Sequence, residues 1–149
     1  MRSVGSAAVG ALVMATVLGA GLFCGWKRLG AEEALLPGTY DASPAWMLTR
    51  YALTILAGLA GGYVSAALDG TMRAPRILAA AAFAAGALVL VVTWPSARAV
   101  NPRGDVVTFV DAVRLTREPA WLVSLWPLVG ASGVLMGALR RAQGRDSGA

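Results

Sequence analysis

The chain has 149 residues, of which 57% are hydrophobic and only 14% are charged, with 13 Lys and Arg against 8 Asp and Glu. A soluble domain usually carries about a quarter of its residues as charged side chains, so this composition excludes an ordinary soluble domain. Histidine is missing and Cys24 is the single cysteine. These two facts exclude histidine-ligated haem and metal sites, catalytic pairs that use histidine, CxxC redox centres and an intramolecular disulfide.

Four stretches of the chain contain no Asp, Glu, Lys or Arg: 3–26, 51–68, 77–97 and 119–139. A helix needs about 20 apolar residues to cross the hydrocarbon core of a bilayer. The sequence therefore predicts an all-α polytopic membrane protein, a four-transmembrane-helix bundle made of two antiparallel hairpins in one integral membrane domain over 1–149. We expect spans at about 4–26, 45–68, 76–95 and 119–140, and loops at 27–44, 69–75 and 96–118.

The first apolar stretch is about 20 residues long, which exceeds the 7 to 15 of a signal-peptide core, so we expect an uncleaved span. Small residues recur in it at every fourth position, at Ala7, Ala11, Ala15 and Gly19. Small side chains allow helix backbones to approach closely in lipid. We expect this stripe to pack against another helix of the chain, with a second subunit as the alternative.

The second span begins at Ser43-Pro44, a typical capping residue followed by a proline that is tolerated at the first helical position. Arg50 lies about two turns into this span, where we expect its side chain to reach back to the interface rather than to bind a substrate anion. Asp69 ends the span. A carboxylate is disfavoured at a helix C-terminus, so we expect Asp69 to pair with Arg73 or Arg76. Arg50 and Asp69 are the two candidate functional charges.

The third loop contains Val106, Phe109, Val110 and Val113 at helical spacing. This pattern favours an interfacial helix that lies on the membrane, and a short strand over Val106 to Val110 is the alternative. The fourth span contains Pro127, which cannot donate a backbone hydrogen bond and should kink the helix.

Spans two and four share a pattern: each opens with Pro-Ala-Trp, at 44–46 and 119–121, and each contains a GxxxG motif, Gly58/Gly62 and Gly133/Gly137. The shared pattern suggests an internal repeat of two helical hairpins. The alternative is that span starts and helix contacts simply require these residue types. We expect the glycines to pack helices together.

Four tryptophans mark span ends at the side of the first and third loops, where the headgroup level suits an amphipathic ring: Trp26, Trp46, Trp94 and Trp121. The side that carries the termini holds six basic residues close to span ends, whereas the seven on the other side are more widely spread. By the positive-inside rule, we expect both termini in the cytoplasm.

The segment Ala60-Gly61-Gly62-Tyr63-Val64-Ser65-Ala66-Ala67-Leu68, with the Pro119-Ala120-Trp121 entry to the last span, resembles uncharacterised small bacterial inner-membrane proteins with four transmembrane helices. The resemblance implies a multi-pass protein of the bacterial inner membrane. It implies an architecture and no activity.

No catalytic constellation stands out, and no cofactor, metal or nucleic-acid partner is expected, since the basic tail from Arg140 to Arg145 suits anionic lipid. We expect a non-enzymatic accessory or assembly subunit that packs against a membrane-protein partner or a second copy in the bilayer. The alternative, a small transporter or lipid-handling protein, requires a polar or lipid-sized cavity reached from the outer leaflet. A membrane enzyme is the third option, and it would need folding to gather the loop carboxylates Asp41, Asp105, Asp111 and Glu118.

Overall fold

The computed structural model describes residues 2–93, 103–104 and 106–146, and this part of the chain is all-helical. Its helices are α1 (Arg2–Ala34), α2 (Pro44–Asp69), α3 (Arg73–Thr93), α4 (Phe109–Leu115), α5 (Ala120–Val123) and α6 (Trp126–Asp146). Four helical segments are long and apolar enough to cross a membrane: Arg2–Ala34, Pro44–Asp69, Arg73–Val92 and Trp121–Gly144. The predicted all-α, four-span architecture is confirmed.

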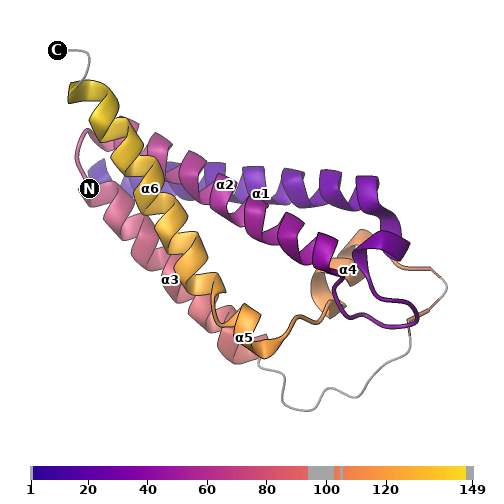
Figure 1. Ribbon diagram of the computed structural model, residues 1–149. Helices are drawn as coiled ribbons and strands as arrows, with labels where there is room; N and C mark the ends of the chain where they lie inside the picture. The colour runs from indigo at the N-terminus through magenta and orange to yellow at the C-terminus, as the bar shows by residue number, and fades with distance from the viewer. Residues whose placement is uncertain (1, 94–102, 105, 147–149) are drawn as a thin grey trace.

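The four long helices form one bundle (Figure 1). Helix α2 packs along both α1 and α6, and α3 packs mainly against α6. Helix α1 begins, α6 ends and α2 turns into α3 at one end of the bundle, which we call the terminal end. The loop between α1 and α2, together with α4 and α5, lies at the opposite end, which we call the connection end.

The boundaries of α1 and α2 follow from local chemistry. The hydroxyl of Ser43 accepts a hydrogen bond from the backbone N–H of Trp46 at 3.2 Å, so the predicted cap of α2 is present. Gly70 ends α2 in the left-handed conformation at φ 71°, which glycine adopts without a steric penalty. Helix α1 continues past the expected end near residue 26 because a bend at Gly30, with φ 67° and ψ 180°, lets the chain re-enter a helix up to Ala34.

Helices α2 and α6 run parallel and meet through their glycines. A Cβ built on Gly58 would lie 3.0 Å from the Cα of Gly133. A Cβ on Gly62 would lie 2.7 Å from the carbonyl carbon of Val134, and one on Gly137 would lie 2.8 Å from that of Leu59. The two GxxxG motifs therefore face each other directly, and the contacts are reciprocal, because Gly62 meets the residue three before Gly137 and Gly137 meets the residue three before Gly62.

The bundle has a small buried cluster at each end. At the terminal end, α1, α3 and α6 contribute Ala7, Ala74, Leu78, Ala79 and Val134. At the connection end, two tryptophans are buried with residues of the first loop and of α4: Trp26, Ala34, Leu35, Ala42, Trp46 and Ala112. The first loop is therefore folded onto the bundle.

The third loop and the fourth span differ in detail from the expectations. Helix α4 begins at Phe109 because the side chain of Thr108 caps it and Asp111 reciprocates in a capping box, so the alternative of a strand over Val106 to Val110 is wrong. The expected kink lies just before Pro127, as a two-residue turn at 124–125 that separates α5 from α6. Pro127 lies in the first turn of α6, where its missing N–H costs no intrahelical bond.

Candidate functional site

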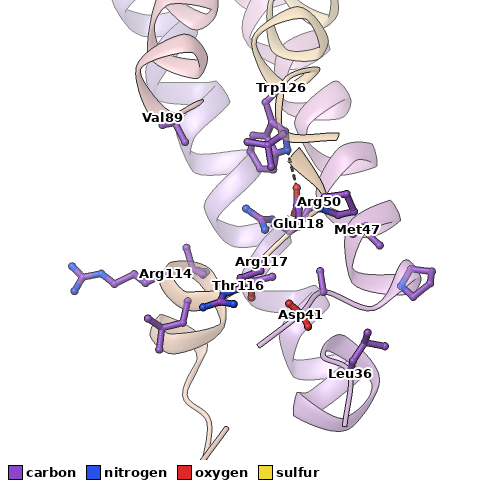
Figure 2. Close-up of a pocket in the computed structure, with 16 residues that line it drawn as sticks. Leu36, Asp41, Met47, Arg50, Val89, Arg114, Thr116, Arg117, Glu118 and Trp126 are labelled. Carbon is purple, nitrogen blue, oxygen red and sulfur yellow. Dashed lines mark hydrogen bonds and ion pairs between the residues drawn. The ribbon is translucent and has the colours of Figure 1, made fainter. Parts of the chain in front are cut away.

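A cavity of about 730 Å³ lies at the connection end, between α2, α3, α4 and the start of α6 (Figure 2). Its lining combines charged residues with a larger apolar part. The charged residues are Asp41, Arg50, Arg114, Arg117 and Glu118. The apolar part includes Met47, Val89, Val113, Leu115, Val123 and Trp126. Since Val89, Val113 and Leu115 are also exposed on the outside of the molecule, the cavity opens at the surface of the bundle.

An ion pair between Arg50 and Glu118 is the most deeply placed pair of charges at this site. Nη1 of Arg50 lies 2.5 Å from Oε1 of Glu118, and the two side chains are 15% and 3% exposed. Arg50, which was expected to reach back to the interface, thus has a partner within the chain. The reason is that Glu118, just before α5, lies at the depth of Arg50 on a neighbouring segment, and pairing offsets part of the cost of burying each charge.

Aromatic side chains fix the orientation of both partners. The indole Nε1 of Trp126 donates to Oε2 of Glu118 at 3.1 Å, so each carboxylate oxygen has a donor. The guanidinium of Arg50 lies over the Trp126 ring at 4.7 Å from its centroid. Figure 2 shows Arg50, Glu118 and Trp126 gathered at the level where α6 begins. The pair is therefore held by a rigid aromatic neighbour.

The break between α5 and α6 separates Glu118 from Trp126 along the chain. Backbone carbonyls at this break accept hydrogen bonds from nearby side chains. The hydroxyl of Tyr51 donates to the carbonyl of Leu122 at 2.6 Å, and that of Ser124 donates to the carbonyl of Trp121 at 2.7 Å. Unpaired carbonyls are costly in a membrane. Tyr51 and Ser124 thus add side-chain donors at the break, where the carbonyl of Leu122 also accepts from the backbone N–H of Leu125 at 2.9 Å.

The first and third loops are joined at the edge of the cavity. The backbone N–H of Ala42 donates to the carbonyl of Arg117 at 2.9 Å, and that of Arg117 donates to the carbonyl of Tyr40 at 2.9 Å. Arg103 further pairs with Glu32. These contacts hold Asp41 and Arg117 in the lining, where Figure 2 places them below Glu118.

Two of the four loop carboxylates considered for an enzyme, Asp41 and Glu118, line the cavity. Asp111 instead belongs to the capping box of α4, and hydrogen bonds from the hydroxyl and backbone N–H of Thr108 hold the pKa of its carboxyl below the usual range. Asp105 lies outside the described residues. Among the described residues, no group of three His, Cys, Asp or Glu side chains could hold a metal ion.

The residues expected to pack helices divide into two groups. Gly58, Gly62, Gly133 and Gly137 are buried between α2 and α6, and Ala7 is buried in the terminal-end cluster. The rest of the α1 stripe, Ala11, Ala15 and Gly19, is exposed, and a Cβ on Gly19 would meet nothing within 4 Å. Helix α1 instead contacts α2 through other glycines: Gly10, Gly21 and Gly25. Because α1 turns Gly10, Gly21 and Gly25 towards α2, the side with Ala11, Ala15 and Gly19 faces outward.

The predicted tryptophan anchors also divide. Trp46 is completely buried and Trp26 is 9% exposed, with their rings edge to face at 6.0 Å. Both rings are therefore buried in the cluster with residues of the first loop. Trp121 is 68% exposed, as an anchor would be, whereas Trp94 lies outside the described residues.

Asp69 has a capping role at the terminal end. Its Oδ2 accepts hydrogen bonds from the Thr71 hydroxyl and from the backbone N–H of Ala74 at 3.3 Å. The expected pairing with Arg73 or Arg76 is replaced by these bonds, because the free N–H groups at the start of α3 favour a carboxylate. Asp69 is not part of the cavity.

Sequence reasoning missed the link between Arg50 and Glu118 and the part played by Trp126. The available signal was the isolated charge of Arg50 in an apolar span, which requires a partner of opposite sign. Glu118 directly precedes a predicted span at the same side of the membrane. Comparisons with family models, with curated proteins and with solved structures gave no match for this chain.

Proposed function

We propose that this protein handles lipid, by holding one membrane amphiphile in the cavity at the connection end. The observation that carries the proposal is the cavity itself, about 730 Å³ with a charged part and a larger apolar part. Ligand pockets are typically about 300 to 1,000 Å³, mostly apolar, with a few convergent polar groups. This is the feature that a lipid-handling protein requires and that an assembly subunit does not.

The lining suits a molecule with a polar head and an apolar chain. Met47, Val123 and Trp126 provide apolar surface beside the Arg50–Glu118 pair. Val89 lines the cavity from α3 and is 50% exposed, so it lies at an opening towards the surroundings of the bundle. A chain entering beside Val89 would leave little apolar surface in water, which favours entry from lipid.

The proposed setting is the bacterial inner membrane with both termini in the cytoplasm, which puts the cavity in the outer leaflet. The arginine-rich terminal side supports this orientation. Cys24, which is exposed near the connection end of α1, offers a test. A membrane-impermeant maleimide added to intact spheroplasts should label Cys24, and labelling only after the membrane is opened from the cytoplasmic side would reverse the orientation.

Obstruction of the cavity opening tests the proposed function. We expect Val89→Trp to reduce the lipid retained by the purified protein, because the indole would fill the space that Val89 borders. Val91→Trp is the matched control, since Val91 is on the same helix, is 73% exposed and does not line the cavity. Native mass spectrometry from lipid nanodiscs would count the lipids bound to each variant. Equal lipid retention by all three proteins would refute the proposal.

The accessory-subunit function remains a second candidate because part of α1 is exposed with small side chains, at Ala11, Ala15 and Gly19. A partner helix would be expected to approach closely there. Ala15→Trp should then dissociate the complex, whereas Leu48→Trp, on an exposed position of α2, should not. A lone monomer in mild detergent that captures no partner would exclude this candidate.

A further inference from the structure

The guanidinium of Arg50 has more hydrogen-bonding capacity than the protein uses. Arginine carries five N–H donors, and within the described part of the chain Arg50 makes one side-chain hydrogen bond, from Nη1 to Glu118. Its side chain lines the cavity and is 15% exposed. The unused donors are therefore available to a molecule in the cavity.

The lining of the cavity keeps a net positive charge although it contains Glu118. One of its oxygens accepts from Arg50 and the other from Trp126, so its charge is shared between two donors. Three arginines and two carboxylates line the cavity: Arg50, Arg114 and Arg117, and Asp41 and Glu118. The formal charge of the lining is thus positive by one, which attracts an anionic group.

A phosphate group suits the remaining donors of Arg50 better than a second carboxylate does. A ligand carboxylate would offer Arg50 the same group that Glu118 already supplies. A phosphate monoester carries a charge of about −1.5 to −2 and three acceptor oxygens, and arginine binds such groups through two parallel hydrogen bonds. A phosphate can therefore use the spare donors of Arg50 while Glu118 stays in place.

We infer that the cavity selects an amphiphile whose headgroup is a phosphate monoester, with Arg50 as the binding residue and Glu118 as the partner that holds Arg50 in place. This inference rests on the proposed function, since it names the headgroup of the amphiphile. Arg50 contacts the phosphate oxygens and the apolar part of the lining contacts the chain.

The experiment compares two lipids with identical acyl chains, phosphatidic acid and diacylglycerol, in phosphatidylcholine nanodiscs, with binding measured by native mass spectrometry. We expect the unchanged protein to bind phosphatidic acid about tenfold more tightly, which corresponds to about 1.4 kcal/mol. Equal binding of the two lipids would overturn the headgroup inference and leave the proposed function standing. Binding of neither would refute both.

Two variants assign the preference to the ion pair. Glu118→Gln keeps an acceptor for Trp126 and frees Arg50, so the preference for phosphatidic acid should increase. Arg50→Gln with Glu118→Gln removes both charges, and this double variant should bind the two lipids equally. A preference that survives in this double variant would overturn the inference. If the double variant does not fold, Glu118→Gln alone is the test, and a weaker preference of this variant for phosphatidic acid would overturn the inference.

A final arm separates a lipid headgroup from a free phosphate ester. Glycerol 3-phosphate added in solution carries the same phosphate without acyl chains. We expect it to compete poorly with phosphatidic acid, because it cannot use the apolar lining. Competition at concentrations comparable to those of the lipid would show that a soluble phosphate ester is the ligand and would overturn the choice of an amphiphile.

Discussion

Substitution of Gly62 by alanine tests the parallel contact between α2 and α6. The added Cβ would lie 2.7 Å from the carbonyl carbon and 2.8 Å from the Cα of Val134, both of which are backbone atoms. Non-bonded carbon atoms prefer separations of about 3.5 to 4.0 Å. The carbonyl oxygen of Val134 lies closer still, so helix α6 would have to move away from α2 by at least about 1 Å, which would also loosen the neighbouring contact between Gly137 and Leu59.

The size of the effect follows from the comparison with Gly19→Ala. Both substitutions gain the same helix propensity of alanine over glycine, up to about 1 kcal/mol. Only Gly62→Ala incurs the cost of overpacking, typically about 1 to 3 kcal/mol, because a Cβ on Gly19 would meet nothing within 4 Å. We expect Gly62→Ala to unfold more easily than Gly19→Ala by about 1 to 3 kcal/mol.

The measurement is the free energy of unfolding in mixed micelles, titrated with a denaturing detergent and followed by circular dichroism for both variants and the unchanged protein. The reasoning would be refuted if the two alanine variants had the same free energy of unfolding. Greater destabilisation by Gly19→Ala would show instead that the exposed stripe of α1 is a helix contact.

Three further predictions concern the connection end. Arg50→Gln should lower the free energy of unfolding by about 3 to 5 kcal/mol, because Glu118 is left as an unpaired buried charge. Removing both charges should lower it by less. A larger loss in the double variant, measured by the same titration, would contradict this reasoning. Tyr51→Phe should cost about 1 kcal/mol, because it removes the donor to a carbonyl at the α5–α6 break; an unchanged unfolding curve would argue against that bond. The pKa of Asp111 lies below its usual value of 3.8, so its cap should persist above that value and be lost as the pH falls through the lower folded value. The amide chemical shift of the capping residue, followed by NMR, should change in that window and stay constant in Asp111→Asn.

Much of the architecture could be predicted because it depends on local sequence. Uncharged stretches of about 20 residues define spans, and Ser43-Pro44 predicts the start of α2 through its own capping chemistry. The GxxxG motifs of α2 and α6 were expected to pack helices, and they lie at the contact between those two helices.

The errors concern the direction in which a helix faces, which periodicity alone does not determine. Helix α1 carries two rows of small residues, and the row with Ala11 and Ala15 was expected to be buried. The structure turns Gly10, Gly21 and Gly25 towards α2 instead, and of these three Gly10 is buried. Which row faces α2 depends on the rotation of α1 against the whole of α2, including the fit of Leu53 beside Gly21. That rotation is a tertiary property.

The cavity was even less accessible to prediction because its residues come from distant parts of the chain. Arg50 and Glu118 are 68 positions apart, and they meet only because α6 packs beside α2 and the chain breaks before Trp126. Trp46 was expected at the interface from its place at a span end, whereas folding of the first loop buries it.

The reciprocal contacts of α2 and α6 have a consequence for assembly. Gly58 meets Gly133, while Gly62 and Gly137 each meet a residue three positions before the other. A surface with this pattern is self-complementary, in the way that a two-fold dimer interface is. Within one chain, the covalent connection gives the partner helix a high effective concentration and favours the closed form. A two-fold pattern that joins copies in a dimer is here contained within a single chain, so α2 and α6 present these faces to each other and not to the lipid.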